Sequence, residues 1–283
     1  MRFPEILAVE GAAGSSYSGR DAMLYALALG FGAETLDGRE LAFVYEKALR
    51  VVPTLNVLLA TGAGAIIEQG GLDYRKIVHG EQRLKIHRPL PASATVRSRS
   101  RCIAVDDKGT AKGAVVDIET IVEDEVDGQA YSTQVMSLFC RGDGGQGGSG
   151  RRELILRQLP ERVADVEVSI ATLPQQALLY RLTGDRNPLH ADPTAARAVG
   201  FAGPILHGLC TYGIACRAIL REFCDYRAER IAALDVRFAG PLYPGETVLL
   251  RFWREGASTL LFDAASAERR APVLSNGRCE LNT

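Results

Sequence analysis

The chain has 283 residues, which is too long for one small domain and fits two domains of about 140 residues each. Hydrophobic residues make up 47% and charged residues 24%, a composition typical of globular proteins rather than disordered ones. The net charge of -1 excludes a general attraction to nucleic acid, and no apolar run approaches the roughly 18 residues of a membrane span. We therefore expect no nucleic-acid or membrane partner.

Neither end of the chain shows a targeting signal. The first 19 residues lack a basic region followed by an apolar core, and the last four, ELNT, are not a peroxisomal address. We therefore expect a cytoplasmic protein. The six cysteines form no CxxC pair and show no zinc-finger spacing, so we expect free thiols and neither a disulfide nor a metal site.

In the first half, β-rich runs predict antiparallel strands. These runs cover residues 94–104, 111–122 and 130–140. The turn sequences Asp-Asp-Lys-Gly at 106–109 and Asp-Gly at 127–128 separate them. Upstream of these runs, residues 61–71 hold too many glycines for a long helix. The first half therefore predicts a sheet with a short or missing helix.

A glycine-rich stretch then divides the chain. Six of the ten residues at 141–150 are glycine, and such a segment cannot hold a regular element at low entropic cost. This predicts two domains, at 1–140 and 153–283, joined by a linker at 141–152.

Three short matches between the halves occur in the same order and at nearly constant offset. The offsets are 155, 151 and 152 residues, for the pairs of segments 22–27 and 177–182, 52–56 and 203–207, and 89–96 and 241–248. Each match alone could arise by chance. Together they predict a duplicated domain.

In the second half, a helix is expected at 205–224, with Pro204 in its first turn. It is apolar on most faces, so other structure must wrap it. Four β-rich runs follow, at 231–238, 247–255, 259–266 and 272–281. A buried helix followed by antiparallel strands predicts a sheet curled around a helix, which is a hot-dog domain. We expect an α+β tandem double hot-dog with its long central helix in the second repeat.

A polar segment between two short helices, at 182–193, is the most informative part of the sequence. Gly184 is expected to end the first helix, and Asp192 to cap the second, with Pro193 in its first turn. Three polar residues lie between them: Asp185, Asn187 and His190. Pro188 restricts the path of this loop, which is typical of a rigidly held site.

These residue types suit the activation of water. A carboxylate and an imidazole that converge on one water molecule can hold it and take its proton. Asn187 offers both a donor and an acceptor to orient the water or the substrate. The unpaired N–H groups in the first turn of the next helix, near Gly208, can polarise a carbonyl group.

The second half resembles the signature of the MaoC-like, R-specific (type 2) enoyl-CoA hydratases, in segments 185–190, 200–201 and 204–208. The resemblance extends to the first half, so it covers most of the chain. There it rests on the segments 20–27, 45–46, 53–54, 79–82, 88–91, 107–109 and 141–145. Gln146 departs from the pattern, which has an aromatic residue there, and this puts the packing of the linker in doubt.

The resemblance implies that this is a hydro-lyase that hydrates trans-2-enoyl-CoA to (R)-3-hydroxyacyl-CoA. It implies that Asp185 and His190 activate the water, that Asn187 assists, and that the Gly208 N–H binds the oxyanion. It implies a first repeat that lacks the motif and binds the acyl chain. Coenzyme A would enter only as part of the substrate, with no other cofactor, and the protein is compatible with a homodimer.

Simpler interpretations exist for each residue. Asp185 alone could cap a helix, but Asn187 and His190 at these spacings argue against that role. Pro204, His207 and His79 are candidates for binding the substrate, and the loop that holds His79 could line a tunnel for the acyl chain. For His207 and His79, a structural role in packing or hydrogen bonding is the simpler interpretation. Arg97 and Arg99 share one strand face with Arg101, which indicates either a solvated face or contact with coenzyme A phosphates.

Three rival functions remain open. A 3-hydroxyacyl-CoA or acyl-carrier-protein dehydratase would run the same reaction in reverse. A hot-dog thioesterase would direct water to the carbonyl carbon, and a non-catalytic acyl-CoA binding protein would not need Asp185 and His190 together. The sequence leaves chain length, direction and oligomeric state undecided.

Overall fold

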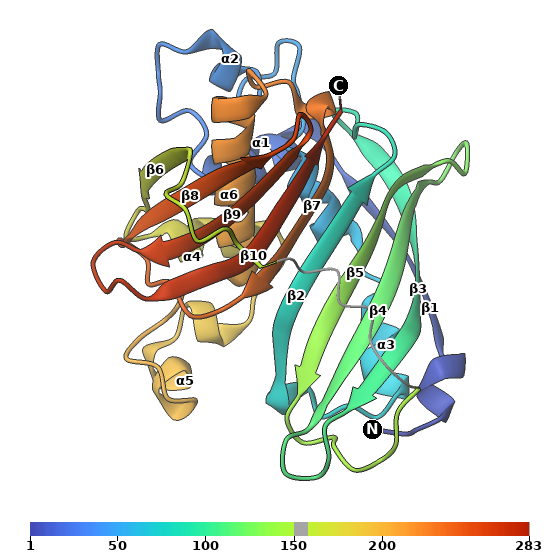
Figure 1. Cartoon of the computed structure of the whole chain (residues 1–283). Helices are drawn as coiled ribbons and strands as arrows, with labels where there is room; N and C mark the ends of the chain where they lie inside the picture. Colours follow the sequence, from blue (N-terminus) through green and yellow to red (C-terminus); the bar gives the residue numbers. More distant parts are fainter. Residues whose placement is uncertain (150–157, 283) are drawn as a thin grey trace.

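In the computed structural model, residues 1–149 and 158–282 are described, and their strands form one continuous ten-stranded sheet (Figure 1). The strands of the first half are β1 (Glu10–Tyr17), β2 (Ile77–Ile86), β3 (Ala94–Asp107), β4 (Ala114–Asp124) and β5 (Ala130–Cys140). Those of the second half are β6 (Val166–Ala171), β7 (Ile231–Phe238), β8 (Thr247–Glu255), β9 (Thr259–Ser266) and β10 (Pro272–Leu281).

The two halves of the sheet have the same strand order. The first half runs β1-β3-β4-β5-β2 and the second runs β6-β8-β9-β10-β7, counted from each outer edge to the centre. The halves join where β2 pairs antiparallel with β7, from Glu81 opposite Arg237 to Lys85 opposite Ala233. This repeated topology confirms the tandem double hot-dog fold. Residues 150–152 of the predicted linker lie outside the described residues.

The helices lie mostly between the first and second strands of each repeat. They are α1 (Gly19–Ala28), α2 (Gly38–Leu41), α3 (Ala63–Gln69), α4 (Gln176–Tyr180), α5 (Pro193–Ala198) and α6 (Gly208–Phe223). With 16 residues, α6 is the central helix of the second repeat (Figure 1). Its residues from Cys210 to Leu220 are all buried. Among the described residues, none of the helices has the length and apolarity to cross a bilayer.

The start of α6 corrects one expectation. The helix begins at Gly208 rather than at Ile205, and Pro204 lies before it in an irregular segment. The backbone of that segment is already paired, since Leu206 N–H donates to Leu242 at 2.7 Å and the Ile205 carbonyl accepts from His190 at 2.8 Å. Because these backbone groups are paired outside the helix, the helix begins only after them, at Gly208.

The first repeat has no counterpart of α6, as predicted. A 3-10 helix at Pro53–Leu59 and the 7-residue α3 take its place. Glycines explain the break between them, because the backbone of β1 passes very close to it. A Cβ atom on Gly11 would lie 2.1 Å from the Gly62 carbonyl oxygen, and one on Gly62 would lie 2.9 Å from Ser100 Oγ.

The described part of the glycine-rich stretch packs on the β3–β4 hairpin. The Asp107 carboxylate accepts hydrogen bonds from the backbone N–H groups of Gly145 at 2.8 Å and Gly147 at 2.7 Å. A Cβ atom on Gly144 would lie 2.1 Å from the Gly109 carbonyl oxygen. The glycines therefore allow the backbone of this stretch to pack closely against the β3–β4 hairpin.

Candidate active site

Asp185 follows directly from the end of a helix. After α4, a 3-10 turn at Arg181–Thr183 ends at Gly184, whose φ of 141° favours glycine. Asp185 comes next, and its Oδ1 accepts a hydrogen bond from the Asn187 backbone N–H at 3.0 Å. The loop therefore orients the carboxylate from within, and Asp185 stays more accessible than the two histidines near it.

His190 is held by a second short turn. The 3-10 helix Pro188–His190 is capped by Asn187, whose Oδ1 accepts from Leu189 N–H at 3.0 Å. His190 is 8% exposed, and its Nδ1 lies 2.8 Å from the Ile205 carbonyl oxygen. Because a carbonyl oxygen only accepts, Nδ1 carries the proton and Nε2 of the neutral ring is left as the basic nitrogen.

The protonation of His190 supports this assignment. Burial lowers the pKa of its imidazole, while the hydrogen bond to Ile205 and the charge of Asp185 oppose the shift. The ring is therefore neutral near pH 7, with a free lone pair on Nε2. A neutral imidazole beside a carboxylate can accept a proton from water.

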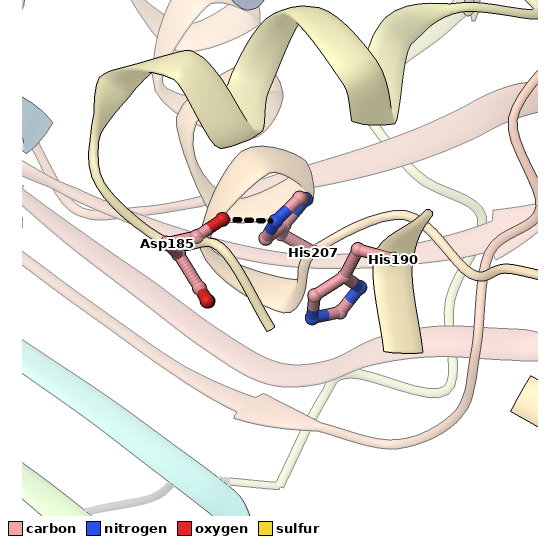
Figure 2. A group of neighbouring side chains, drawn as sticks. All are labelled: Asp185, His190 and His207. Atoms are coloured by element: carbon pink, nitrogen blue, oxygen red, sulfur yellow. Dashed lines mark hydrogen bonds between the residues drawn. The ribbon is translucent and has the colours of Figure 1, made fainter. Parts of the chain in front are cut away.

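His207 lies beside both residues at the start of α6 (Figure 2). Its ring stacks on that of His190 with centroids 3.7 Å apart and planes 24° apart. Its Nε2 lies 3.2 Å from the backbone carbonyl oxygen of Asp185. Tyr180 covers another side of the ring, at a centroid distance of 4.8 Å.

Gly208 is the first residue of α6, so its N–H has no partner within the helix. The positive end of the helix dipole adds to this N–H group as an anion site. Gly208 is exposed, and the Phe238 ring at the end of β7 lies 3.0 Å from where a Cβ atom would stand. The position is therefore open to a ligand's oxygen but narrow for a side chain.

His79 brings the first repeat to the same place. It stands on β2, next to β7, and its ring contacts the edge of Phe238 at a centroid distance of 4.9 Å. Burial lowers the pKa of His79 to about 4, and the nearby charge of Asp185 opposes this shift. The second repeat carries the motif, but the first repeat supplies part of the wall.

The remaining candidates fall into two groups. Pro204 lies half-buried in the segment that carries the Ile205 carbonyl, so it borders the site. Arg97 and Arg99 are exposed on β3, which β4 and β5 separate from β2, a distance of about 14 Å at normal strand spacing. Arg99 pairs there with Glu123. The structure does not bring these two arginines to Asp185.

Asp185, His190 and His207 form a group whose potential ligand atoms lie within 4.8 Å of one another. The geometry nevertheless fits a metal ion poorly. The lone pair of an imidazole nitrogen lies in the ring plane, so two stacked rings at 24° cannot both point to one ion. One nitrogen of each ring hydrogen-bonds a backbone carbonyl. The group is built for hydrogen bonding.

Two contributors to the site were not predicted from sequence. The Ile205 carbonyl sets which nitrogen of His190 is basic, and Phe238 closes the space over Gly208. Neither carries a sequence signal, because one is a backbone atom and the other an ordinary apolar strand residue.

Comparisons with known proteins match both halves of the chain. Residues 156–276 match the profile of the MaoC like domain, and residues 15–142 match that of the MFE-2 hydratase 2 N-terminal domain. The chain is 40% identical to the enoyl-CoA hydratase ChsH3 of Mycobacterium tuberculosis, covering 92% of this chain and 91% of that protein.

The chain is also similar to part of a longer enzyme and to a protein of known structure. The chain is 37% identical to the peroxisomal multifunctional enzyme type 2 of Mus musculus over 94% of its own length, but spans 37% of that protein. The crystal structure of a MaoC-like dehydratase from Phytophthora capsici is 33% identical, with a TM-score of 0.89. That alignment covers 100% of this chain and 99% of the other.

Proposed function

Since this chain belongs to the family of MaoC-like, type 2 enoyl-CoA hydratases, we propose that Asp185 and His190 are its water-activating pair. The chain is a hydro-lyase that adds water to enoyl-CoA thioesters. The observation that carries the residue assignment is the bond from His190 Nδ1 to the Ile205 carbonyl. It leaves Nε2 unprotonated beside the Asp185 carboxylate, where a proton can be accepted.

The proposed reaction has two stages. Water held between Asp185 and His190 gives a proton to His190 Nε2 as its oxygen bonds the β-carbon. The π electrons move to the thioester oxygen, and the Gly208 N–H at the N-terminus of α6 stabilises the resulting enolate. The enolate then collapses, and the proton is delivered to the α-carbon on the same face. The product is an (R)-3-hydroxyacyl-CoA.

The other parts of the site have supporting roles in this proposal. Asn187 holds the loop through its Oδ1 and its backbone N–H. Pro204 and His79 border the space for the thioester, and the first repeat binds the acyl chain. No cofactor other than the substrate's own coenzyme A takes part. A cytoplasmic homodimer completes the proposal, and sedimentation and cell fractionation test those two points.

Substitutions of the pair provide the direct test. Asp185→Asn removes the charge and His190→Ala removes the base, so each should lower kcat by about 10²–10⁴-fold. The double variant should be little worse than the worse single one, because groups that act as a unit are not additive. Asn187→Ala should cost less than either, and KM should change much less than kcat.

The measurement is the loss of enoyl absorbance with crotonyl-CoA and with a longer trans-2-enoyl-CoA. Circular dichroism spectra that match the wild type show that each variant is folded. A His190→Ala enzyme that keeps more than about a tenth of the wild-type kcat would show that the base has been assigned wrongly.

The reverse reaction is the second candidate. The solved relative from Phytophthora capsici is called a dehydratase, and one site must catalyse both directions of a reversible reaction. Incubation with an (R)-3-hydroxyacyl-CoA should therefore produce enoyl absorbance. The same variants should lose hydration and dehydration activity by the same factor.

A further inference from the structure

His207 is buried between the residues of the proposed pair and takes no part in the steps described above. It is 1% exposed, and it is the residue that immediately precedes α6. It contacts Asp185 through a hydrogen bond, His190 through ring stacking, and Gly208 through the peptide bond. One residue thus adjoins all three proposed contributors to the reaction, two of them through its side chain.

The protonation of His207 follows from its partner. The Asp185 carbonyl oxygen can only accept, so His207 Nε2 carries the proton and donates it. Burial, followed by the neighbouring His190, lowers the pKa of His207 to about 4, so the ring is neutral near pH 7. Its Nδ1 is buried and has no hydrogen-bond partner within residues 1–149 and 158–282. The Nε2–H group is therefore the one through which the His207 ring makes its hydrogen bond to Asp185.

Most hydrogen bonds around Asp185 lie within its own loop, such as the bond from Thr183 Oγ1 to the Tyr180 carbonyl at 2.7 Å. Asn187 N–H bonds the Asp185 side chain within the loop, and the bond from Arg181 to the Arg186 carbonyl is 3.5 Å long. Within the part of the chain that the structure describes, the bond from His207 ties the Asp185 backbone to the residue before α6. Since an error of about 1 Å in the position of a reacting group can cost about 10²-fold in rate, this bond matters for turnover.

We propose that His207 is a positioning residue, whose Nε2–H holds Asp185 at the correct distance from His190 and from the N-terminus of α6. This inference rests on the proposed function. The stacking on His190 is the lesser contribution, because a ring without the N–H can also stack. The contribution of the N–H donor can therefore be tested separately from that of the aromatic ring.

Two substitutions make that separation. His207→Phe keeps an aromatic ring and removes the donor, whereas His207→Gln keeps an N–H donor in a similar place and removes the ring. With crotonyl-CoA, His207→Phe should lower kcat by at least about 10-fold and change KM by less than about 3-fold. His207→Gln should keep kcat within about 3-fold of the wild type.

Asn56 offers a matched control. It stands at the position of the first repeat that corresponds to His207, is 1% exposed, and donates to the Pro53 carbonyl at 2.9 Å. Asn56→Ala should lower the melting temperature as a buried polar substitution does, yet leave kcat for crotonyl-CoA unchanged. A loss of kcat in this variant too would mean that general destabilisation explains the His207 effect.

The wild-type protein provides a test that needs no variant. The chain has four histidines, so ¹⁵N-labelled histidine gives few signals to assign. His207 should appear as the Nε2–H tautomer throughout the neutral pH range. An Nδ1–H tautomer overturns the proposal, as does a His207→Phe enzyme with wild-type kcat, or one in which only KM rises. If the wild type hydrates no enoyl-CoA at all, the proposed function fails instead.

Discussion

At the scale of single residues, one backbone atom determines which ring nitrogen of His190 is basic. His190 could present either ring nitrogen to the substrate, and the Ile205 carbonyl selects Nε2 by accepting a hydrogen bond from Nδ1–H, which keeps the proton on Nδ1. Burial then keeps the ring neutral. The imidazole is thus neutral, with Nε2 unprotonated, before any substrate binds.

We expect the acid side of the pH profile to report His190. The active ring is neutral, and burial lowers its pKa from the ordinary 6.5, so activity should persist through pH 6.5 and fall only below it. Below the midpoint, kcat/KM should fall about tenfold per pH unit, as for one essential base. The charged or titratable groups that face His190 are Asp185 and His207, and Asp185 raises its pKa.

The profile is measured with crotonyl-CoA, and the midpoint is compared with an NMR titration of His190. In Asp185→Asn the residual activity should show a lower midpoint, since the charge that raises the pKa is gone. A midpoint at or above 6.5 in the wild type would contradict a buried neutral base.

At the scale of elements, α6 carries the proposed oxyanion site at one end and a buried ion pair near the other. Arg217 is 4% exposed within α6, and its Nε and Nη2 lie 2.8 Å from Oε1 of Glu40 in α2. Glu40 is fully buried and also accepts the backbone N–H groups of Gly32 at 3.1 Å and Glu34 at 2.9 Å. This ion pair fastens a loop of the first repeat to the helix of the second.

Loss of one partner should therefore be costly. Arg217→Met leaves a buried carboxylate without its cation, which should lower the free energy of unfolding by about 3–5 kcal/mol. The double variant with Glu40→Gln should lose less than the sum of the single losses, because the pair acts together. Urea denaturation of the four proteins measures this. Additive losses would show that the two side chains are not coupled.

At the scale of the whole molecule, the two repeats form one sheet and share one site. The β2–β7 pair joins them, and Glu81 of β2 binds Arg237 of β7 at 2.9 Å. His79 enters the wall of a site whose motif lies about 110 residues away in the other repeat. Neither repeat can therefore unfold without exposing the central edge of the other.

We expect a single cooperative unfolding transition. Trp253, the one tryptophan of the chain, lies on β8 and reports the second repeat, whereas far-ultraviolet circular dichroism reports both repeats. The two signals should change at the same urea concentration, as two-state behaviour requires. Separate midpoints, with the dichroism changing in two steps, would show that the repeats are independent domains.

Much of the architecture followed from local patterns in the sequence. The strands β5 and β7–β10 have the predicted bounds, because their β-rich composition ends at recognisable turns. Gly184 and Asp192 also stand where helix-end preferences place them. The glycines at 61–71 correctly excluded a long helix in the first repeat.

Other elements depended on distant partners. The run Glu10–Tyr17, with its glycines, alanines and serines, shows no strong strand pattern, yet it pairs along its whole length with β3. Similarly, Pro204 fits the first turn of a helix by local rules, but the bond from Leu206 to Leu242 delays the helix to Gly208. In both places, tertiary hydrogen bonds outweigh local propensity.

The candidate site divides in the same way. The sequence by itself placed Asp185, Asn187 and His190, the residues that we propose carry the chemistry, within one loop, because their spacing is a local property. Only the tertiary structure decided which nitrogen of His190 is basic, the contacts of His207 with Asp185 and His190, and the entry of His79. Those features depend on contacts between segments far apart in the chain, which the pairing of β2 with β7 and the packing at the start of α6 bring together.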